Sequence, residues 1–417
     1  MKILLINKFD DKGGAAIATK RLFEALKLKG LDVKLLVQKS TNQNYFSTTT
    51  TLLKNKIDFA RFAIERLKIL TNIKDKQNLF FFDSASFGED ISTHPLVLEA
   101  DIIHLNWINF GFLSLKTLQK LIQLNKPIFW TMHDMWPITG GCFHSRGCQQ
   151  YQTECKNCPF LKNSSKLAKR TFSKKLEIFK NANILPIAIS TWMKEKIESS
   201  AFFRDKELFL SSNTIDTDYY TIEDKKKAKE KLGWNTEKIQ IGFAAFNVSN
   251  KYKGGEFVVE SIKMLQEQNP TLANKTELIA IGKEGDKSIF PDNIKITFTG
   301  YIENEDKMRD MYRAFDLFLM PSLEESLSLV TQEAMSCGTP VVAFNNGGQT
   351  DLIDHKKNGY LAEHKNSKDL KKGIEFILNN PDSYISFQIS ARNKIVKNYS
   401  YPVLAENIIE IYKKVKI

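Results

Sequence analysis

Short apolar runs alternate with amphipathic stretches along most of this chain. The apolar runs lie at residues 2–6, 33–37, 101–105, 127–131, 184–189, 239–246, 277–282, 294–300, 314–320 and 341–344. Between them, stretches such as 15–28 and 256–266 repeat their apolar residues every three or four positions, which is typical of helices that cover a sheet. Apolar strands in alternation with such helices predict an α/β protein with parallel sheets.

Residues 320–344 form the most informative unit of this pattern. A buried strand ends before Pro321, a polar loop follows, and we expect a helix over residues 327–335 that stops at Gly338. The loop then lies at the carboxyl end of a strand, where open α/β sheets bind ligands. A helix that begins there offers free backbone N–H groups to a phosphate.

Two carboxylates in this unit, Glu325 and Glu333, first raise the possibility of glycoside hydrolysis. Eight residues of helix span about 12 Å, at about 1.5 Å per residue. Paired glycosidase carboxyl groups stand roughly 5–9.5 Å apart, so this spacing argues against that reaction. We expect the two glutamates to contact different parts of one ligand.

Size and composition predict a two-domain protein that is soluble and globular. A chain of 417 residues with 42% hydrophobic and 26% charged residues exceeds one ordinary core. No signal peptide is visible, because the first apolar run ends at Asn7, and no run approaches the roughly 20 apolar residues of a spanning helix. The expected location is cytoplasmic, with at most peripheral contact at the inner face of the plasma membrane. The net charge of +12 suits nucleic acid, anionic lipid or an anionic substrate.

Basic segments add three expectations about the surface. Residues 52–76 combine large apolar side chains with several lysines and arginines, so they could form a helix that lies on an anionic membrane. A surface helix packed on its own domain is the favoured interpretation. The lysine-rich stretches 162–180 and 223–231 are interpreted as solvated, the latter as a solvated helix.

Four of the five cysteines lie close together, at Cys142, Cys148, Cys155 and Cys158. In a reducing compartment, four thiolates around a tetrahedral zinc ion are favoured over two disulfides, with His144 able to replace one cysteine. A closed site of this kind leaves no position for a reacting water, so its role would be structural. Free or partly paired thiols remain the alternative.

Polar groups also follow the strands of the first half. Gly13 and Gly14 separate the first strand from the first helix and allow the backbone to approach a ligand closely. His133 and Asp134 follow the run 127–131, at the edge where a site would be built.

The order of these features resembles a known family. Glu325-x7-Glu333 followed by Ala-Met-Ser-Cys-Gly-Thr-Pro-Val-Val, then Gly347-Gly348 and Asn358-Gly359-Tyr360, resembles the signature of retaining GT-B glycosyltransferases of family 4. Lys253-Gly254 matches the family's Lys-Gly, and bacterial members carry similar cysteine-rich insertions. The resemblance covers nearly the whole chain and is most specific over residues 316–361. It implies two Rossmann-like domains that face each other across a cleft. The implied parts are an acceptor-side domain at 1–206 with the cysteine-rich loop 142–158, a nucleotide-sugar domain at 207–396, and a helix at 397–417 that crosses back.

The resemblance also implies roles for individual residues. Glu325 would bind sugar hydroxyls, Lys253 the donor diphosphate, and His133 would face the donor sugar. The remaining implied ligand contacts are Gly13, Gly14, Asn247, Lys251, Tyr301, Ser328, Leu329, Val330 and Glu333. Of these, Ser328, Leu329 and Val330 would give backbone amides to the phosphates, Glu333 would bind the ribose, and Tyr301 lies in the loop that holds the base. Lys251 could compensate for an arginine that the family often has where this chain has Val248.

The implied activity is transfer of a sugar, with retention, from a nucleotide-diphosphate sugar to a hydroxyl of a glycan or lipid-linked glycan in surface polysaccharide synthesis. No metal is expected at the diphosphate if Lys253 and the helix N-terminus carry its charge. A GT-B sugar-nucleotide epimerase or phosphorylase remains an alternative. A zinc-containing nucleic-acid binder is disfavoured, because the basic residues are dispersed and no base-reading motif accompanies the cysteines.

Overall fold

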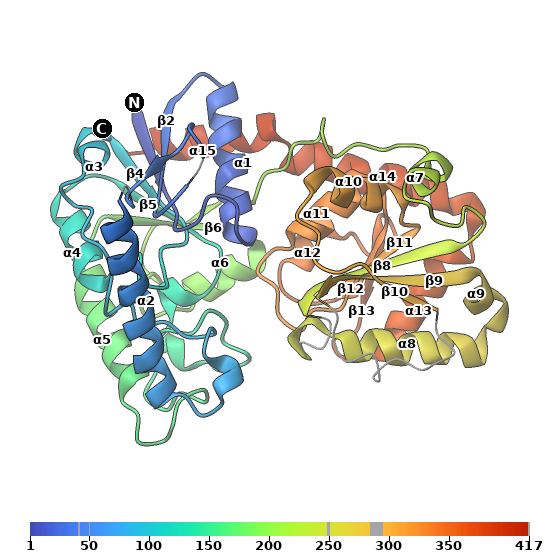
Figure 1. Cartoon of the computed structure of the whole chain (residues 1–417), viewed down its shortest axis with the longest axis horizontal. Helices are drawn as coiled ribbons and strands as arrows, with labels where there is room; N and C mark the ends of the chain where they lie inside the picture. The colour runs from blue at the N-terminus through green and yellow to red at the C-terminus, as the bar shows by residue number, and fades with distance from the viewer. Residues whose placement is uncertain (41, 50, 248–250, 284–294, 416–417) are drawn as a thin grey trace. The chain divides into compact units, whose positions relative to one another are not determined.

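The chain folds into two compact units. The computed structural model describes residues 1–40, 42–49, 51–247, 251–283 and 295–415. The first unit comprises Met1–Thr214 with Leu404–Ile417, and the second comprises Ile215–Val403. Each unit contains one parallel sheet with helices on its faces (Figure 1).

The first unit has a seven-stranded sheet in the order β3-β2-β1-β4-β5-β6-β7. Its strands are β1 (Lys2–Ile6), β2 (Asp32–Val37), β3 (Phe46–Ser47), β4 (Ile102–Leu105), β5 (Ile128–Met132), β6 (Ile184–Ala188) and β7 (Phe209–Leu210). Its helices are α1 (Gly14–Leu28), α2 (Leu52–Asn72), α3 (Pro95–Glu99), α4 (Leu115–Gln123), α5 (Leu167–Phe179), α6 (Thr191–Glu198) and α15 (Tyr401–Lys413), with short 3-10 turns η1 (Lys76–Asn78), η2 (Trp136–Ile138) and η3 (Gln150–Gln152).

The second unit has a six-stranded sheet in the order β10-β9-β8-β11-β12-β13. Its strands are β8 (Ile239–Asn247), β9 (Thr276–Lys283), β10 (Ile296–Phe298), β11 (Leu317–Met320), β12 (Val341–Phe344) and β13 (Gly359–Ala362). Its helices are α7 (Lys225–Lys231), η4 (Lys251–Lys253), α8 (Gly255–Gln268), α9 (Pro270–Lys275), α10 (Glu305–Ala314), α11 (Leu329–Ser336), α12 (Gln349–Leu352), α13 (Ser367–Leu378) and α14 (Pro381–Tyr399).

Both sheets confirm the predicted α/β class with two parallel-sheet, Rossmann-like domains. Their central strands are mainly apolar and buried on both faces, as strands β11 and β12 illustrate. In each sheet the chain starts in the middle, builds outward on one side, and then returns to build on the other. The direction reverses between β1 and β4 in the first unit and between β8 and β11 in the second. The carboxyl ends at these reversals are where ligands bind in such sheets.

α15 is the last helix of the chain, and from Leu404 onward it belongs to the first unit. The hydroxyl of its Tyr412 lies 2.5 Å from Nδ1 of His104, a buried residue of β4. Nε2 of the same ring lies 2.7 Å from Oγ1 of Thr131 in β5. The histidine therefore joins the last helix to two central strands.

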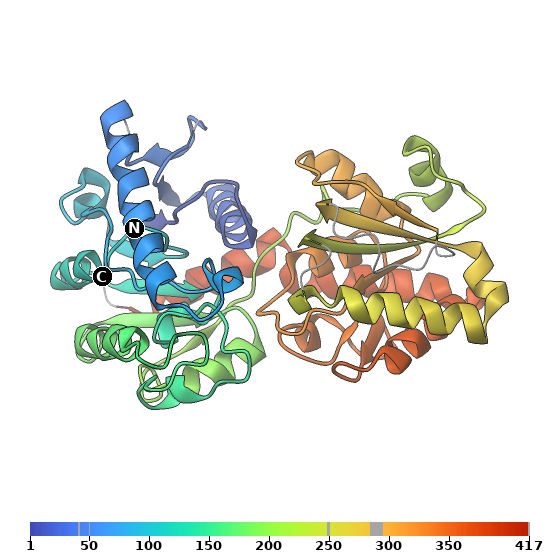
Figure 2. The ribbon, with the colours of Figure 1, turned by 60° about the horizontal axis from the view of Figure 1, so that its bottom comes forward.

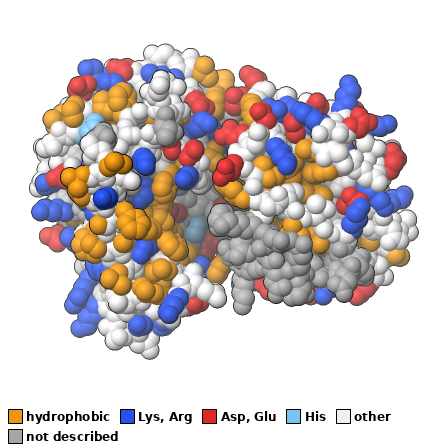
Figure 3. Space-filling model, in the orientation of Figure 1, with side chains coloured by type: hydrophobic (Ala, Val, Ile, Leu, Met, Phe, Trp, Pro, Cys, Tyr) orange, Lys and Arg blue, Asp and Glu red, His pale blue; other side chains and the backbone are white. Residues whose placement is uncertain are grey.

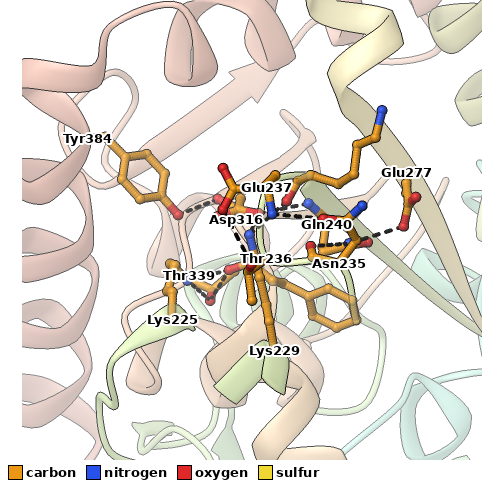
Figure 4. A network of polar contacts seen from close by, with 12 residues as sticks. Lys225, Lys229, Asn235, Thr236, Glu237, Gln240, Glu277, Asp316, Thr339 and Tyr384 are labelled. Carbon is orange, nitrogen blue, oxygen red and sulfur yellow. Dashed lines mark hydrogen bonds and ion pairs between the residues drawn. The ribbon is translucent and has the colours of Figure 1, made fainter. Parts of the chain in front are cut away.

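The amino ends of the second sheet are joined by a polar network (Figure 4). The Asp316 carboxylate, just before β11, accepts from Nζ of Lys229 at 2.7 Å and from the backbone N–H of Gln240 at 2.7 Å. Gln240 in turn donates to Glu277 at 3.1 Å, and the Tyr384 hydroxyl donates to the Asp316 carbonyl at 2.7 Å. These contacts hold β8, β9 and β11 at the edge opposite the loops that follow those strands.

The network corrects the expectation that residues 223–231 form a merely solvated helix. Lys229 is buried, and Nζ of Lys225 donates to the carbonyl of Phe315. Burial lowers the pKa of Lys225 to about 8. Two lysines of α7 therefore hold this helix on the sheet.

Removal of the Asp316 carboxylate should destabilise the second unit by about 3–5 kcal/mol, because the buried Lys229 ammonium would lose its counter-charge. Chemical denaturation of Asp316→Ala measures this loss. Asp306→Ala is the control, because Asp306 pairs with Arg309 at the surface, where such a pair contributes less than about 1 kcal/mol. Equal effects of the two substitutions would contradict the structural role of the network.

Candidate active site

The second unit brings two of the predicted site residues into direct contact. Lys253 follows β8 and Glu325 follows β11, so both lie at the carboxyl ends of the two strands between which the sheet reverses. Nζ of Lys253 is 2.9 Å from Oε2 of Glu325. Both side chains are partly exposed, so a ligand can reach them. A cation and a carboxylate placed side by side at this position suit a ligand that carries both phosphate and hydroxyl groups.

Three glycines hold the loops that carry this pair. Gly254 has φ +73°, and a Cβ atom there would lie 2.0 Å from the carbonyl oxygen of Pro321. Gly347 has φ +56°, and its Cβ would lie 2.1 Å from the carbonyl oxygen of Glu325. The Gly348 N–H donates to that same oxygen at 2.9 Å. The backbone of the Glu325 loop is therefore positioned by close contacts that only glycine permits.

Asn346, which the sequence did not single out, supports the same loop. Its amide donates to the carbonyls of Ser322 and Leu323 at 3.1 and 2.7 Å. It also lies 3.0 Å from Nδ1 of His364, which follows β13. The loop after β12 thus holds the loop after β11 through an asparagine directly before the glycine pair.

α11 begins later than predicted, at Leu329 rather than residue 327. Ser328 is its N-cap, and the serine hydroxyl accepts from the N–H of Thr331 at 3.2 Å. Glu325 therefore lies in the loop before the helix, and the estimate of its distance from Glu333 along a helix does not apply. Leu329 and Val330 form the first turn, where backbone N–H groups have no partner within the helix.

Glu333 is the fifth residue of α11 and is buried. Burial raises the pKa of the Tyr312 hydroxyl in α10 well above its ordinary value, and the charge of Glu333 raises it further. Glu333 therefore faces α10 with at least part of its carboxylate. Tyr301 follows β10 in an exposed segment, directly after Gly300 at φ +72°.

The described backbone places Asn247 at the end of β8 and Lys251 in η4. Val248 lies outside the described residues.

The first unit brings His133 and Asn106 together at the ends of β5 and β4. Nε2 of His133 lies 3.0 Å from Oδ1 of Asn106. Burial lowers the pKa of His133 to about 4, so the imidazole is neutral near pH 7. A neutral imidazole bonded in this way can exchange hydrogen bonds with a ligand but does not bring a positive charge. Asn106 was missed, because only the order of the strands shows that it lies beside His133.

Asp134 has a structural position next to His133. Its carboxylate accepts from Nε1 of Trp107 at 2.9 Å and from the backbone N–H of Trp136 at 2.8 Å. Burial raises the pKa of this carboxyl. These bonds fix the turn that follows β5 and so fix the direction of His133.

A buried lysine of α5 also stabilises this turn. Lys175 of α5 donates to the carbonyls of Trp136 and Thr139 and lies over the Trp136 ring. Burial lowers its pKa to about 7. Part of the lysine-rich stretch 162–180, expected to be solvated, is therefore internal.

Gly13 and Gly14 lie at the start of α1, as predicted. Gly13 is the N-cap with φ +89°, a conformation that favours glycine, and no side chain caps this end of the helix. The first turn contains no acidic residue. An anion at this point would meet the positive end of a 15-residue helix.

The four clustered cysteines line one small cavity of about 20 Å³, together with Phe82, Tyr151 and Phe160. All four are free thiols, and the backbone N–H of Gly140 lies 3.2 Å from Sγ of Cys155. Within the described part of the chain, however, no three His, Cys, Asp or Glu side chains form a group that could hold a metal ion. The structure therefore gives the predicted zinc site no support, and it shows four free thiols that line this cavity.

Comparisons with known proteins show that parts of this chain are similar to glycosyltransferases. Residues 224–398 match the sequence profile of the family Glycosyl transferases group 1. The match covers most of the second unit and none of the first. The matched residues include the Lys253–Glu325 pair, α11 and the glycine loop after β12.

Individual relatives match parts of the chain. An uncharacterized glycosyltransferase of Haemophilus influenzae is 30% identical over 165 residues, which is 39% of this chain and 45% of the relative. The putative colanic acid biosynthesis glycosyl transferase WcaC of Escherichia coli is 22% identical over 280 residues, 65% of each chain. The chain thus spans between about half and two thirds of the length of these curated relatives.

Solved structures share the fold over the full length. Anabaena Alr3699/HepE, solved with UDP, has a TM-score of 0.65 at 16% identity, with all of both chains covered. WaaG, a glycosyltransferase involved in lipopolysaccharide biosynthesis, has a TM-score of 0.63 at 13% identity, with 99% of each chain covered. At this identity the likeness establishes the two-domain fold alone.

The low pKa of His133 predicts that acid destabilises the first unit. The unfolded histidine binds a proton below about pH 6.5, whereas the folded one does so only near pH 4. The contribution of His133 to the free energy of unfolding is fully present above pH 6.5. It decreases as the pH falls, by at most about 2 kcal/mol at pH 5. Thermal unfolding of wild type and His133→Asn at pH 7.5 and 5 measures this difference. Identical pH dependence of the two proteins would contradict a neutral His133.

Proposed function

We propose that this protein is a retaining glycosyltransferase of family 4 that moves a sugar from a nucleotide-diphosphate sugar to a hydroxyl acceptor. The observation that carries the proposal is the contact between Lys253 and Glu325 at the reversal point of the second sheet. It lies within the stretch that matches the group 1 glycosyltransferase profile. Under this proposal residues 207–396 bind the nucleotide sugar, residues 1–206 bind the acceptor, and residues 397–417 return to the first domain.

In this proposal one side chain and the N-terminus of one helix stabilise the negative charge of the donor diphosphate. Lys253 places an ammonium beside the diphosphate and stabilises the negative charge that grows on the departing phosphate. Ser328, Leu329 and Val330 supply backbone amides at the N-terminus of α11, which adds the favourable end of the helix dipole. A diphosphate at Lys253 would replace its bond to Glu325, and Glu325 would then bind sugar hydroxyls.

The reaction needs no protein nucleophile in this proposal. The bond between the anomeric carbon and the phosphate oxygen breaks, and the acceptor oxygen bonds to the same face of that carbon. The leaving phosphate takes the proton of the acceptor hydroxyl, so charge and atoms balance. His133, as a neutral imidazole, and the amides of Gly13 and Gly14 are assigned to positioning the sugar, the diphosphate or the acceptor.

Several further contacts complete the proposed donor site. Glu333 is assigned to the ribose and Tyr301 to the loop that holds the base. Asn247 and Lys251 are assigned to the diphosphate end. Because Alr3699/HepE was solved with UDP and with UDP-glucose, UDP-sugars are the first donors to test.

The proposed acceptor is a glycan or a lipid-linked glycan of a surface polysaccharide. Two relatives support this class, since WcaC is named for colanic acid biosynthesis and WaaG for lipopolysaccharide biosynthesis. Incubation of each donor with and without acceptor separates the alternatives, because an epimerase changes the donor alone. A phosphorylase would instead require inorganic phosphate.

Loss of either member of the central pair should abolish transfer. We expect Lys253→Met and Glu325→Gln to lower kcat/KM at least about 100-fold, the scale at which removal of a charge-stabilising group acts. Lys263→Met is the matched control, since Lys263 is an exposed lysine of α8 and should keep wild-type turnover. Turnover of Glu325→Gln equal to that of the control would remove Glu325 from the site.

The glycine contact behind Glu325 gives a second test of the site. Gly347→Ala places a Cβ against the Glu325 carbonyl and should displace the loop, so donor-induced thermal stabilisation should be lost. Gly233→Ala is the control, because Gly233 has a similar φ of +69° but open space around its Cβ. That variant should show only the cost of the left-handed conformation, about 1 kcal/mol, with donor binding intact. Equal donor response in both variants would contradict the proposed position of the donor.

A further inference from the structure

α2 (Leu52–Asn72) packs on the first unit with its charged side. Asp58, Glu65 and Arg66 are buried, together with Ile69. These charges find partners inside the unit: Arg66 contacts the Asp83 carboxylate at 2.9 Å, and Glu65 accepts two bonds from Ser84, at 2.8 Å from its backbone N–H and 2.6 Å from its hydroxyl. The inward side of the helix is therefore polar and bonded to the rest of the unit.

The outward side of the same helix is apolar. Six large side chains on it are exposed by between 41% and 84%: Leu52, Leu53, Ile57, Phe59, Ile64 and Leu67. At about 100° per residue they fall within one arc of roughly 160°, opposite the buried charges. An ordinary surface helix shows the reverse arrangement, with apolar residues inward and charges in water.

The figures show how accessible this helix is. α2 lies on the outside of its unit in both ribbon views (Figures 1 and 2). In the space-filling view, orange side chains gather over that part of the unit with blue lysines and arginines between them (Figure 3). Contiguous apolar surface of this kind marks an interaction site.

The charges around this face are mainly basic. Lys56 is exposed within the apolar arc, and Lys74 and Lys76 are exposed on either side of Asp75 just beyond the end of the helix. Lys162 reaches the same end and donates to the carbonyl of Thr71 at 2.9 Å. Both acidic residues of α2 are buried, so the helix presents only positive charge outward.

We propose that the outer face of α2 docks on an anionic lipid bilayer. A helix of 21 residues lies flat along a surface over about 31 Å, at about 1.5 Å per residue. Its apolar side chains enter the boundary of the acyl chains, while its lysines extend to anionic headgroups. A second copy of the chain fits less well, because the same positively charged face would be present on both copies. Within the described residues no helix is long and apolar enough to cross a membrane.

The docking proposal extends the proposed function, whose acceptor is a glycan that can be carried on a lipid. It rests on the helix alone, however, and vesicle binding is measured without donor or acceptor. Its failure is therefore distinguishable from failure of the transferase proposal.

Co-sedimentation with vesicles tests the proposal on the full chain. Wild type should bind vesicles that contain phosphatidylglycerol, and binding to pure phosphatidylcholine vesicles should be at least tenfold weaker. The variant Leu53→Ser/Phe59→Ser/Ile64→Ser should lose at least tenfold in partitioning to anionic vesicles. Because these side chains are already exposed, its thermal stability and its transfer to a water-soluble acceptor should equal those of wild type.

The matched control changes two exposed isoleucines of α14 in the second unit. Ile385→Ser/Ile389→Ser replaces two side chains that are exposed by 62% and 51%, and it should bind vesicles as wild type does. Lys56→Glu/Lys74→Glu should abolish the preference for anionic over neutral lipid. Equal binding of wild type and the α2 serine variant would overturn the proposal. The proposal would also be overturned if light scattering showed that wild type is a dimer and the α2 serine variant a monomer, because the outer face of α2 would then bind a second copy of the chain.

Discussion

The direction of the strands is the constraint on which this molecule depends. In a parallel sheet every strand ends at the same edge, so loops that are far apart in sequence meet there. Lys253 and Glu325 are separated by 72 residues, yet they form an ion pair because β8 and β11 are neighbours. His133 and Asn106 meet for the same reason at the ends of β5 and β4. Both units thus bring polar groups together where neighbouring parallel strands end.

The polar groups that stabilise the second sheet and the residues of the candidate site lie at opposite edges of that sheet. Around Asp316, at the amino ends, polar groups are buried and bonded to one another, and they keep the strands in register. At the carboxyl ends, Lys253 and Glu325 remain partly exposed and pair with each other at 2.9 Å. Glycines at 254, 347 and 348 let the loops approach closely, because a Cβ atom at each would lie 2.0–2.2 Å from a backbone carbonyl oxygen. A ligand can therefore exchange partners at the site without disturbing the groups that hold the sheet.

Much of the fold could be predicted from the sequence, because buried parallel strands are short apolar runs bounded by turn residues. The position of Lys253, Glu325 and His133 at strand ends followed from the same pattern. The predicted start of α11 was wrong by two residues. Ser328 caps the helix with its own side chain, so the loop before the helix extends further than the apolar pattern indicates. The solvated interpretation of α7 failed because the partner of Lys229 is Asp316, far along the chain. Amphipathicity of residues 52–72 was visible in the sequence, but only the packed structure shows that the charged side faces inward.

The central claim is that Lys253 and Glu325 form the donor site of a nucleotide-sugar transferase. A crystal structure of the full chain with UDP tests it most directly. The account predicts that a phosphate oxygen lies within hydrogen-bonding distance of Nζ of Lys253, that the diphosphate faces the first turn of α11, and that the Lys253–Glu325 ion pair is broken. A nucleotide bound elsewhere, with that ion pair still at its present 2.9 Å, would contradict it.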